Sequence, residues 1–581
     1  MRNAVIAVID SGMLPQSYAS SCVIGSFALS KNETEWEILE SPMKDYIGHG
    51  TAVSNIIWNI NPNVNIVVFR ICNDVLNVDE FGLVKVLEFI YANIDVDIIN
   101  ISAGVTYLYD YNAINDICLK LSKKGVIIIS AFDNDGAISY PAALECVVGV
   151  DVKNIKKNEI IFIENGISNI VLSDKYYRTE WLNTKTIIKG TSFACAHISG
   201  LLSLKINSHL STSEMIYSIA TKFERKSNHE IFLKPQFHIH RAIVFPINKE
   251  SHALLRFKDK LNFEIVSLYD ERLSGKVGKS MFGEIIKSYD DIDWLENFDT
   301  IILSCVSELE RLTKRDYVQE IVSNAKSFGK NIYSFEPLPF YDESMFYPNI
   351  GKNNVPIQNE MKLHKITIPI VEVVGTSSKQ GKFTMQQKII HQLSQMGYNV
   401  GSIITEPSGY LFNADYVFHF GYHANLDLHP SEYIAILNEM LFEVQKKKKD
   451  ILITGCQSGV VHYNNSNIND FAILQYSFLL GTLPDVFILC INPHDDLEYI
   501  RKSINFLNSI DDGKVRAIVV FPMKAIVTLS GIGYRVEEIA DNEFLKIKNE
   551  LQNEFNLPVF SMSDSDTLQI CSLIIDEFSS N

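Results

Sequence analysis

The sequence contains no run of the roughly 18 apolar residues that a helix needs to cross a bilayer. None of its cysteines forms a Cys-x-x-Cys pair, so zinc and thioredoxin-like sites have no support, and no clear acidic calcium loop is present. There is also no internal repeat and no low-complexity tract. We therefore expect no membrane span and no metal site.

Basic residues are too few for a nucleic-acid partner. Lys and Arg number 52 against 69 Asp and Glu, which gives a formal net charge of −17. Phosphate backbones bind surfaces rich in Lys and Arg, and such an excess is missing. We expect neutral or basic peptides as partners, with neither nucleic acid nor a membrane.

The nine cysteines are odd in number and widely scattered along the chain. The simplest interpretation is that they are reduced thiols in a cytosolic protein. The apolar residues before Asp10 are too short for a signal peptide. Both features predict a cytoplasmic protein.

A chain of 581 residues suggests about three domains. Up to about residue 240, apolar β-rich runs alternate with helical stretches, which is typical of a parallel α/β sheet. The predicted strands are residues 4–9, 65–71, 98–102 and 126–130, and the predicted helices are residues 80–94 and 111–123.

The same alternation continues twice more. A second block has predicted strands at 241–246, 263–268, 300–304 and 331–334 and a helix at 314–328. The polar stretch 336–360 is predicted to be a linker. A third block has predicted strands at 366–374, 400–405, 451–454, 486–491 and 515–521. The predicted domains are residues 1–240, 241–350 and 360–581, all of the α/β class.

Three short segments supply a carboxylate, an imidazole and a hydroxyl, in that order along the chain. Asp10 ends a hydrophobic strand, and His49 lies between two glycines. Ser192 follows Gly190 and Thr191 and opens a predicted helix. A serine hydroxyl becomes a nucleophile when a histidine takes its proton and a buried carboxylate holds that histidine in the right tautomer. The three side chains therefore predict a Ser–His–Asp catalytic relay.

This order of residues resembles that of the subtilisin-like serine peptidases, over about residues 1–240. Residues 127–136 resemble the family's oxyanion segment, with Asn134 at the place of the side-chain amide donor. The resemblance implies a three-layer fold around a parallel sheet. It also implies that Asn134 and the backbone amide of Ser192 hold the oxyanion, and that proteolysis needs no cofactor.

Residues 99–104 resemble the family's strand that pairs with an extended substrate, which implies a substrate-binding role for Ser102, Ala103 and Gly104. Two positions depart from the family pattern. Asp133 stands where the family usually has glycine, and Ala196 stands where it has proline. Secreted members usually carry a pro-region before the aspartate strand, and this sequence has no room for one. An inactive peptidase fold is the alternative interpretation.

A glycine-containing loop follows the predicted strand at 366–374 and leads into a helix. Strand, loop and helix form the setting in which backbone N–H groups bind phosphates. The expected nucleotide-binding residues are Gly375, Thr376, Gly381, Lys382 and Thr384, with ATP or GTP and Mg²⁺ as the expected ligand. A structural glycine turn that binds no ligand is the alternative.

In this loop Phe383 stands between Lys382 and Thr384, whereas the usual P-loop pattern has Gly-Lys-Ser/Thr. Hydrolysis needs carboxylates near the strand ends. The best candidate strand, 451–454, ends in Thr454, and Asp450 stands at its other end. The sequence therefore predicts nucleotide binding and does not decide between binding alone and NTPase activity.

From about residue 241, the chain resembles a bacterial family with a Rossmann-like module followed by a P-loop domain. Gly381-Lys382-x-Thr384, residues 405–409 and residues 455–458 carry this resemblance. Members include clostridial proteins of peptide natural-product maturation and others that act on acylated amino acids. The resemblance implies a Rossmann-like α/β domain and a P-loop NTPase-like domain after the peptidase.

These observations lead to one main functional hypothesis and two alternatives. The main one is a cytoplasmic endopeptidase that cuts leader from core in a ribosomally made precursor peptide, with maturation enzymes as partners. The first alternative is a nucleotide-binding scaffold that presents peptides to partner enzymes. The second is a peptidase whose rate depends on nucleotide at Lys382.

Overall fold

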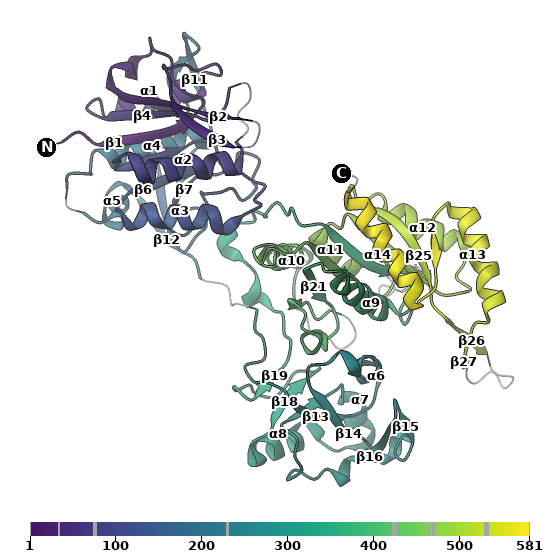
Figure 1. Ribbon diagram of the computed structural model, residues 1–581. Helices are drawn as coiled ribbons and strands as arrows, with labels where there is room; N and C mark the ends of the chain where they lie inside the picture. Colours follow the sequence, from purple (N-terminus) through teal and green to yellow (C-terminus); the bar gives the residue numbers. More distant parts are fainter. Residues whose placement is uncertain are drawn as a thin grey trace. The chain divides into compact units, whose positions relative to one another are not determined.

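A computed structural model of the chain describes residues 2–32, 35–73, 78–208, 210–227, 232–420, 427–462, 465–467, 471–527 and 534–579. The chain divides into two compact units. Unit 1 holds residues 1–229 and 356–367, and unit 2 holds residues 230–355 and 368–581. Figure 1 shows the elements of each unit.

Unit 1 is built on a ten-stranded sheet in the order β12-β8-β9-β7-β6-β5-β1-β4-β2-β3. All neighbours are parallel except β2 with β3 and β8 with β9. The strands are β1 (Val5–Asp10), β2 (Val23–Lys31), β3 (Trp36–Glu40), β4 (Asn65–Arg70), β5 (Ile98–Ile101), β6 (Ile127–Ala131), β7 (Val148–Lys153), β8 (Ile160–Glu164), β9 (Ile170–Ser173) and β12 (Lys222–Arg225).

Helices cover both faces of this sheet. The helices are α1 (His49–Ile60), α2 (Glu80–Asn93), α3 (Tyr111–Lys123), α4 (Thr191–Ser203) and α5 (Thr212–Ile219), and β10 (Tyr177–Trp181) with β11 (Thr184–Ile188) forms a separate hairpin. Side chains of α1 and α4 share one core with Ile6 and Val8 of β1. Ala7 and Ile9 point to the opposite face and are also fully buried. The expected three-layer α/β fold is confirmed.

A segment of the expected linker belongs to unit 1. Residues 356–367 are separated in sequence from the rest of that unit by residues 230–355. Backbone hydrogen bonds join them to it, from Ile167 N–H to the carbonyl of Gln358 and from Ile138 N–H to the carbonyl of Leu363. The expected domain boundary at residue 360 thus falls within a segment that is bound to the first domain.

Unit 2 contains two further sheets. The first has the order β15-β16-β14-β13-β17-β18-β19 and is parallel apart from the short β15. Its elements are β13 (Arg241–Phe245), α6 (Lys249–Arg256), β14 (Glu264–Asp270), β15 (Ser280–Met281), β16 (Glu284–Ser288), β17 (Thr300–Leu303), α7 (Ser307–Thr313), α8 (Tyr317–Phe328), β18 (Asn331–Ser334) and β19 (Met345–Phe346).

The second sheet of unit 2 is fully parallel, in the order β22-β21-β23-β20-β24-β25-β28. Its strands are β20 (Ile370–Gly375), β21 (Val400–Ile404), β22 (Tyr416–Val417), β23 (Ile451–Gly455), β24 (Val486–Ile491), β25 (Lys514–Val520) and β28 (Val559–Phe560). The helices are α9 (Lys382–Gln395), α10 (Pro430–Gln445), α11 (Ile473–Thr482), α12 (Leu497–Leu507), α13 (Asp541–Phe555) and α14 (Asp564–Ser579), and β26 (Met523–Val527) pairs with β27 (Tyr534–Glu538).

An apolar cluster joins the two sheets of unit 2. Phe257, just after α6, packs on Phe383 of α9 and on Phe412, with ring centroids 6.2 Å apart in both pairs. This contact holds the end of α6 against the start of α9. Loops from both sheets can therefore contribute to one site.

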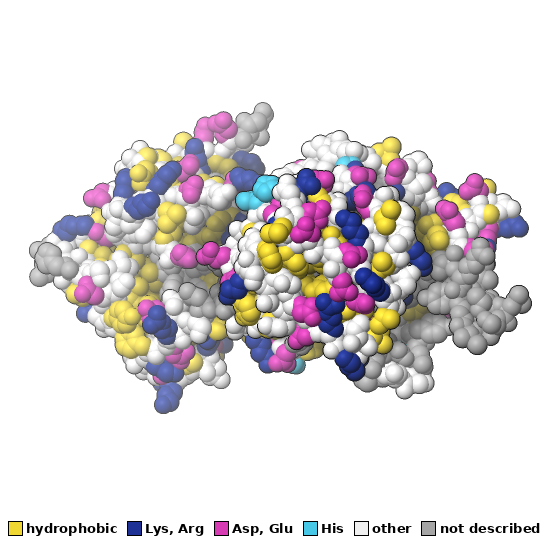
Figure 2. Space-filling model, turned by 90° about the horizontal axis from the view of Figure 1, so that it is seen from below, with side chains coloured by type: hydrophobic (Ala, Val, Ile, Leu, Met, Phe, Trp, Pro, Cys, Tyr) yellow, Lys and Arg dark blue, Asp and Glu magenta, His cyan; other side chains and the backbone are white. Residues whose placement is uncertain are grey.

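No helix among the described residues is long and apolar enough to cross a membrane. Figure 2 shows acidic and basic side chains interspersed over the face that it presents.

Candidate active site and phosphate loop

Asp10 and His49 form a buried hydrogen-bonded pair. Asp10 ends β1 and is fully buried, and His49 is the first residue of α1. The Nδ1 atom of His49 lies 2.8 Å from Oδ1 and 3.0 Å from Oδ2 of Asp10. A carboxylate at Nδ1 fixes the tautomer in which Nε2 is free to accept a proton.

Burial alone lowers the pKa of His49, but the charge of Asp10, its hydrogen bond and the charge of Asp45 outweigh this effect. The net result is a raised pKa. The carboxylates therefore stabilise the imidazolium that forms when His49 takes a proton.

Asp45 organises the loop that carries His49, a role that the sequence analysis missed. Its Oδ1 accepts the backbone N–H of Gly48 at 2.7 Å and the hydroxyl of Ser11 at 2.9 Å. Its Oδ2 accepts the N–H of Thr51 at 2.9 Å. An acidic residue three positions before a Gly-His-Gly-Thr segment is the signal that was available. This carboxylate caps the first turn of α1 and so fixes the backbone at His49.

The loop after β1 approaches α1 so closely that only glycine fits at position 50. A Cβ atom there would lie 2.2 Å from the carbonyl oxygen of Gly12 and 3.1 Å from the Cβ of Asp10. The glycine beside His49 thus allows the helix to reach Asp10.

Ser192 lies in the first turn of α4 and is nearly buried. Its hydroxyl donates to the backbone carbonyl of Ser102 at 2.8 Å, and no hydrogen bond joins it to His49 among the described residues. Both side chains nevertheless line one cavity of about 470 Å³, together with Asn134, Ala103 and Gly104 among others. The ring of the adjacent Phe193 lies 5.1 Å from that of His49.

Asn134 is held by the residue that precedes the serine. Its Oδ1 accepts the backbone N–H of Thr191 at 3.2 Å and the hydroxyl of Thr191 at 3.1 Å. Because the oxygen is occupied, the amide nitrogen is the end of the side chain that remains to donate. Ser192 and Asn134 are thereby linked through one neighbour.

The carboxylate of Asp133, the main departure from the family pattern, has a local partner. Its Oδ2 accepts the backbone N–H of Asp135 at 2.9 Å, while its own N–H donates to Ser139. This turn gives the negative charge a hydrogen-bond partner on the loop itself.

Ser102 ties the expected substrate strand to the helix of Ser192. Its hydroxyl accepts from Asn100 Nδ2 at 2.7 Å and lies 3.4 Å from the Ser192 carbonyl oxygen. Asn100 Oδ1 in turn accepts from the hydroxyl of Ser199 on α4 at 2.9 Å. This buried network fixes the carboxyl end of β5, where Ala103 and Gly104 follow.

In unit 2, the loop that is expected to bind phosphate joins β20 to α9. The N–H of Ser377 donates to the side-chain oxygen of Gln380 at 2.9 Å, and Gln380 is fully buried. The carboxamide oxygen thus accepts a hydrogen bond from an N–H group that would bind a phosphate oxygen in a loop of this kind. Gly375 supports this arrangement, since a Cβ atom there would lie 2.6 Å from the Gln380 oxygen, and Gly381 has a positive φ of 74°. The hydroxyl of Thr376 donates to Asp495.

Lys382 is almost completely buried, and its Nζ donates to the carbonyl of Ser377 at 2.6 Å. Burial lowers its pKa, while Cys490, Cys456 and Glu406 act in the opposite direction. A buried cation whose charge is poorly compensated is suited to an anionic ligand.

Thr384 contacts a cation from the neighbouring domain of unit 2. The Nη1 atom of Arg256 on α6 donates to the Thr384 hydroxyl at 2.7 Å. A guanidinium at this hydroxyl does not fit the magnesium-binding role that the loop pattern predicts. The arrangement fits a phosphate better, because Arg256, Lys382, Lys249 and Lys379 all line one cavity of about 260 Å³.

Glu406, which follows β21, lines the same cavity and was not singled out from the sequence as an acid. Its Oε1 accepts from Gln457 at 2.9 Å. Burial, then the charge of Glu250, raise its pKa to about 7, although Lys249, Gln457 and Lys382 oppose them. The carboxylate near a strand end therefore follows β21 and not β23.

Two family matches cover most of the chain. Residues 1–222 match the Subtilase family. Residues 358–570 match a family described as a domain of unknown function, the DUF1611_C P-loop domain.

One curated protein and two solved structures illustrate these likenesses. Subtilisin DY from Bacillus licheniformis is 25% identical over 232 residues, which is 37% of this chain and 81% of that protein. A lanthipeptide protease structure has 18% identity and a TM-score of 0.31, over 37% of this chain and 78% of its own. A DUF1611 family protein from Anabaena variabilis has 12% identity and a TM-score of 0.40, over 58% of this chain and all of its own.

Proposed function

We propose that this chain is a cytoplasmic serine endopeptidase that processes a ribosomally made precursor peptide. Its N-terminal part is a peptidase domain of the subtilase family, and its C-terminal part is a DUF1611_C P-loop domain. One observation carries the catalytic part of this proposal. His49, which is hydrogen-bonded to the buried Asp10, lines the same cavity as Ser192 and Asn134.

In the proposed mechanism, the Ser192 hydroxyl attacks the scissile carbonyl while Nε2 of His49 takes its proton. Asp10 holds Nδ1 and stabilises the imidazolium. The negative charge on the tetrahedral oxygen is held by the Ser192 backbone N–H, at the start of α4, and by the Asn134 amide. His49 then gives its proton to the leaving amine, and water releases the acyl group by the reverse route.

A fluorophosphonate probe tests the nucleophile directly. Wild-type protein should be labelled at Ser192, whereas Ser192→Ala and His49→Ala should not, with circular dichroism as the control for folding. Equal labelling of wild type and Ser192→Ala would remove the mechanism.

The substrate class rests on the peptide-binding strand and on the resemblance of the C-terminal part to peptide-maturation proteins. The cavity wall formed by Ser102, Ala103 and Gly104 suits an extended peptide backbone. All nine cysteines are free thiols, which supports the cytoplasmic location. Short peptides encoded beside the gene should be cut once, at a leader–core junction, and mass spectrometry should find neither fragment with Ser192→Ala. Intact peptides with a fully labelled Ser192 would contradict this substrate class while leaving the peptidase in place.

One observation favours the alternative of a peptide-presenting scaffold. The Ser192 hydroxyl is bonded to the Ser102 carbonyl and not to His49. If this state persists with peptide bound, the domain would hold peptides for partner enzymes without cutting them. Peptide binding by a wild type that neither cleaves nor reacts with the probe would support it.

We further propose that the loop 375–384 binds the phosphates of ATP or GTP. The contributing residues are Gly375, Thr376, Gly381, Lys382 and Thr384, with Arg256 as an added cation. The buried ammonium of Lys382 supports this role. Lys382→Ala should abolish binding of inorganic tripolyphosphate in calorimetry, and unchanged binding would rule the loop out.

A further inference from the structure

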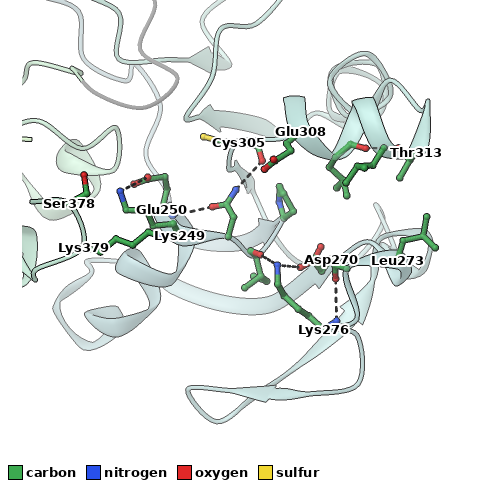
Figure 3. A pocket seen from close by; sticks show the side chains of 16 residues that line it. Lys249, Glu250, Asp270, Leu273, Lys276, Cys305, Glu308, Thr313, Ser378 and Lys379 are labelled. Atoms are coloured by element: carbon green, nitrogen blue, oxygen red, sulfur yellow. Dashed lines mark hydrogen bonds and ion pairs between the residues drawn. The ribbon is translucent and has the colours of Figure 1, made fainter. Parts of the chain in front are cut away.

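A second, larger cavity opens beside the phosphate loop. It measures about 590 Å³, and Figure 3 shows Ser378 and Lys379 of the loop at one end and Leu273 and Thr313 at the other. Lys249, Glu250, Ser378 and Lys379 line this cavity and also the smaller phosphate cavity. The two spaces are therefore neighbouring compartments of one site.

The larger compartment lies where ligands bind in open parallel sheets. β13 has β14 on one side and β17 on the other, so the chain leaves β13 in one direction and returns on its opposite side. The loops that follow β13, β14 and β17 all line the compartment. This is the point at which the strand order reverses, and such points bind nucleotides in doubly wound folds.

The N-terminus of α6 lies beside this compartment, but its N–H groups are not free to bind a phosphate. Oδ1 of Asn248 already accepts the N–H of Glu250 at 3.1 Å and of Ser251 at 3.3 Å at the start of α6. A carboxylate at Glu250 also stands in this first turn, and the loop has no Gly-x-Gly sequence. The phosphates of a ligand in this compartment must therefore bind elsewhere. The adjoining loop 375–384, which contains Ser378 and Lys379, can bind them.

The walls and floor of the compartment suit a nucleoside. Leu273 and Leu312 line it and remain 79% and 75% exposed, although apolar side chains of this size gain by being covered. The floor holds Asp270, the last residue of β14, whose Oδ2 lies 3.2 Å from Nζ of Lys276. An acid at the end of the second strand is the group that binds ribose hydroxyls in such folds.

We propose that this compartment binds the ribose and base of a nucleotide whose phosphates lie on the loop 375–384. The inference rests on the proposed phosphate site. The base packs between Leu273 and Leu312, and the ribose hydroxyls donate to Asp270 or accept from Lys276.

Calorimetry on the full chain with ATP, GTP, 2′,3′-dideoxy-ATP and inorganic tripolyphosphate tests this assignment. ATP or GTP should bind at least tenfold more tightly than tripolyphosphate. The dideoxy compound, which lacks the ribose hydroxyls, should lose most of this gain in affinity over tripolyphosphate. This comparison uses the wild-type protein throughout.

Two variants make the test specific. Asp270→Asn and Leu312→Lys should both remove the advantage and leave tripolyphosphate affinity unchanged. Their matched controls are Asp291→Asn and Leu295→Lys, exposed residues of the same domain that do not line either cavity, and these should bind like wild type.

The possible failures are distinguishable. Equal affinity for nucleotide and tripolyphosphate, or an advantage that survives Leu312→Lys, would overturn the nucleoside assignment and keep the phosphate site. If tripolyphosphate fails to bind the wild type at all, the phosphate site is wrong and the nucleoside assignment falls with it.

Discussion

Nζ of Lys362 and Oδ2 of Asp151 form an ion pair at 3.0 Å in which the side chains are only 11% and 6% exposed. Lys362 belongs to the segment 356–367, which folds with unit 1 although the chain on both sides of it belongs to unit 2. Its ammonium also lies 5.5 Å from the ring centroid of Phe132, two residues before Asn134. The segment thus braces the loop that carries the proposed oxyanion donor.

Lys362→Met should destabilise unit 1 by about 3–5 kcal/mol, since it leaves Asp151 as an unpaired buried charge. Adding Asp151→Asn should restore much of the loss. Urea unfolding followed by tryptophan fluorescence in a Trp294→Phe background reports on unit 1, which holds the other three tryptophans. The control is Lys365→Ala in the same segment, an exposed lysine over Tyr107, which should cost less than about 1 kcal/mol. Equal effects of the two substitutions would show that the ion pair is unimportant.

Asp10→Asn should lower the turnover number by about 10⁴-fold, because it removes the charge that holds the tautomer of His49. Proteolysis requires neutral His49, and its pKa is raised in the wild type. The rate of fluorophosphonate labelling should therefore rise with pH around a midpoint above the ordinary 6.5. In Asp10→Asn, the residual reaction should have a lower midpoint. An identical midpoint in both proteins would disprove the coupling.

Asn134→Ala should reduce the turnover number by about 10²–10³-fold with little change in KM, because the amide stabilises charge that develops only in the transition state. The matched control is Asp133→Asn on the same loop. It should change the turnover number less than threefold, since its carboxylate is bonded to the N–H of Asp135. Steady-state kinetics on a cleaved peptide distinguishes the two. A larger effect at position 133 would instead place that carboxylate at the reacting oxygen.

Glu372→Gln should remove a pH dependence from the stability of unit 2. Glu372 is fully buried on β20, and burial raises its pKa to about 8 against the opposing hydrogen bond from Thr482. The folded protein therefore binds a proton that the unfolded chain releases near pH 4.5. The free energy of unfolding should fall as pH rises from about 4.5 to about 8.

Thermal unfolding at pH 5 and pH 8 measures this effect as the difference between wild type and Glu372→Gln. The wild type should lose more stability between the two values than the variant. Parallel curves would mean that Glu372 keeps one protonation state in the folded and unfolded protein.

The sequence alone determined many of the local elements and the residues that we propose for the main site. Strong apolar runs identified β1, β4 and β18 to within a residue, and the helix over α3 to the residue, because strands buried on both faces and amphipathic helices leave clear patterns. The three motifs pointed to Asp10, His49 and Ser192. Glycines stand next to these residues because the backbone segments approach one another closely there, and this leaves a pattern that can be read in the sequence.

Only the tertiary structure decided which segments that are far apart in the sequence contact one another. Three features left no local pattern in the sequence: the binding of the segment 356–367 to unit 1, the contact of Arg256 with Thr384, and the cavity above Asp270. Each depends on side chains that meet across different elements. Periodicity reports which face of an element is buried, but which elements then come together follows from packing and hydrogen bonding in three dimensions.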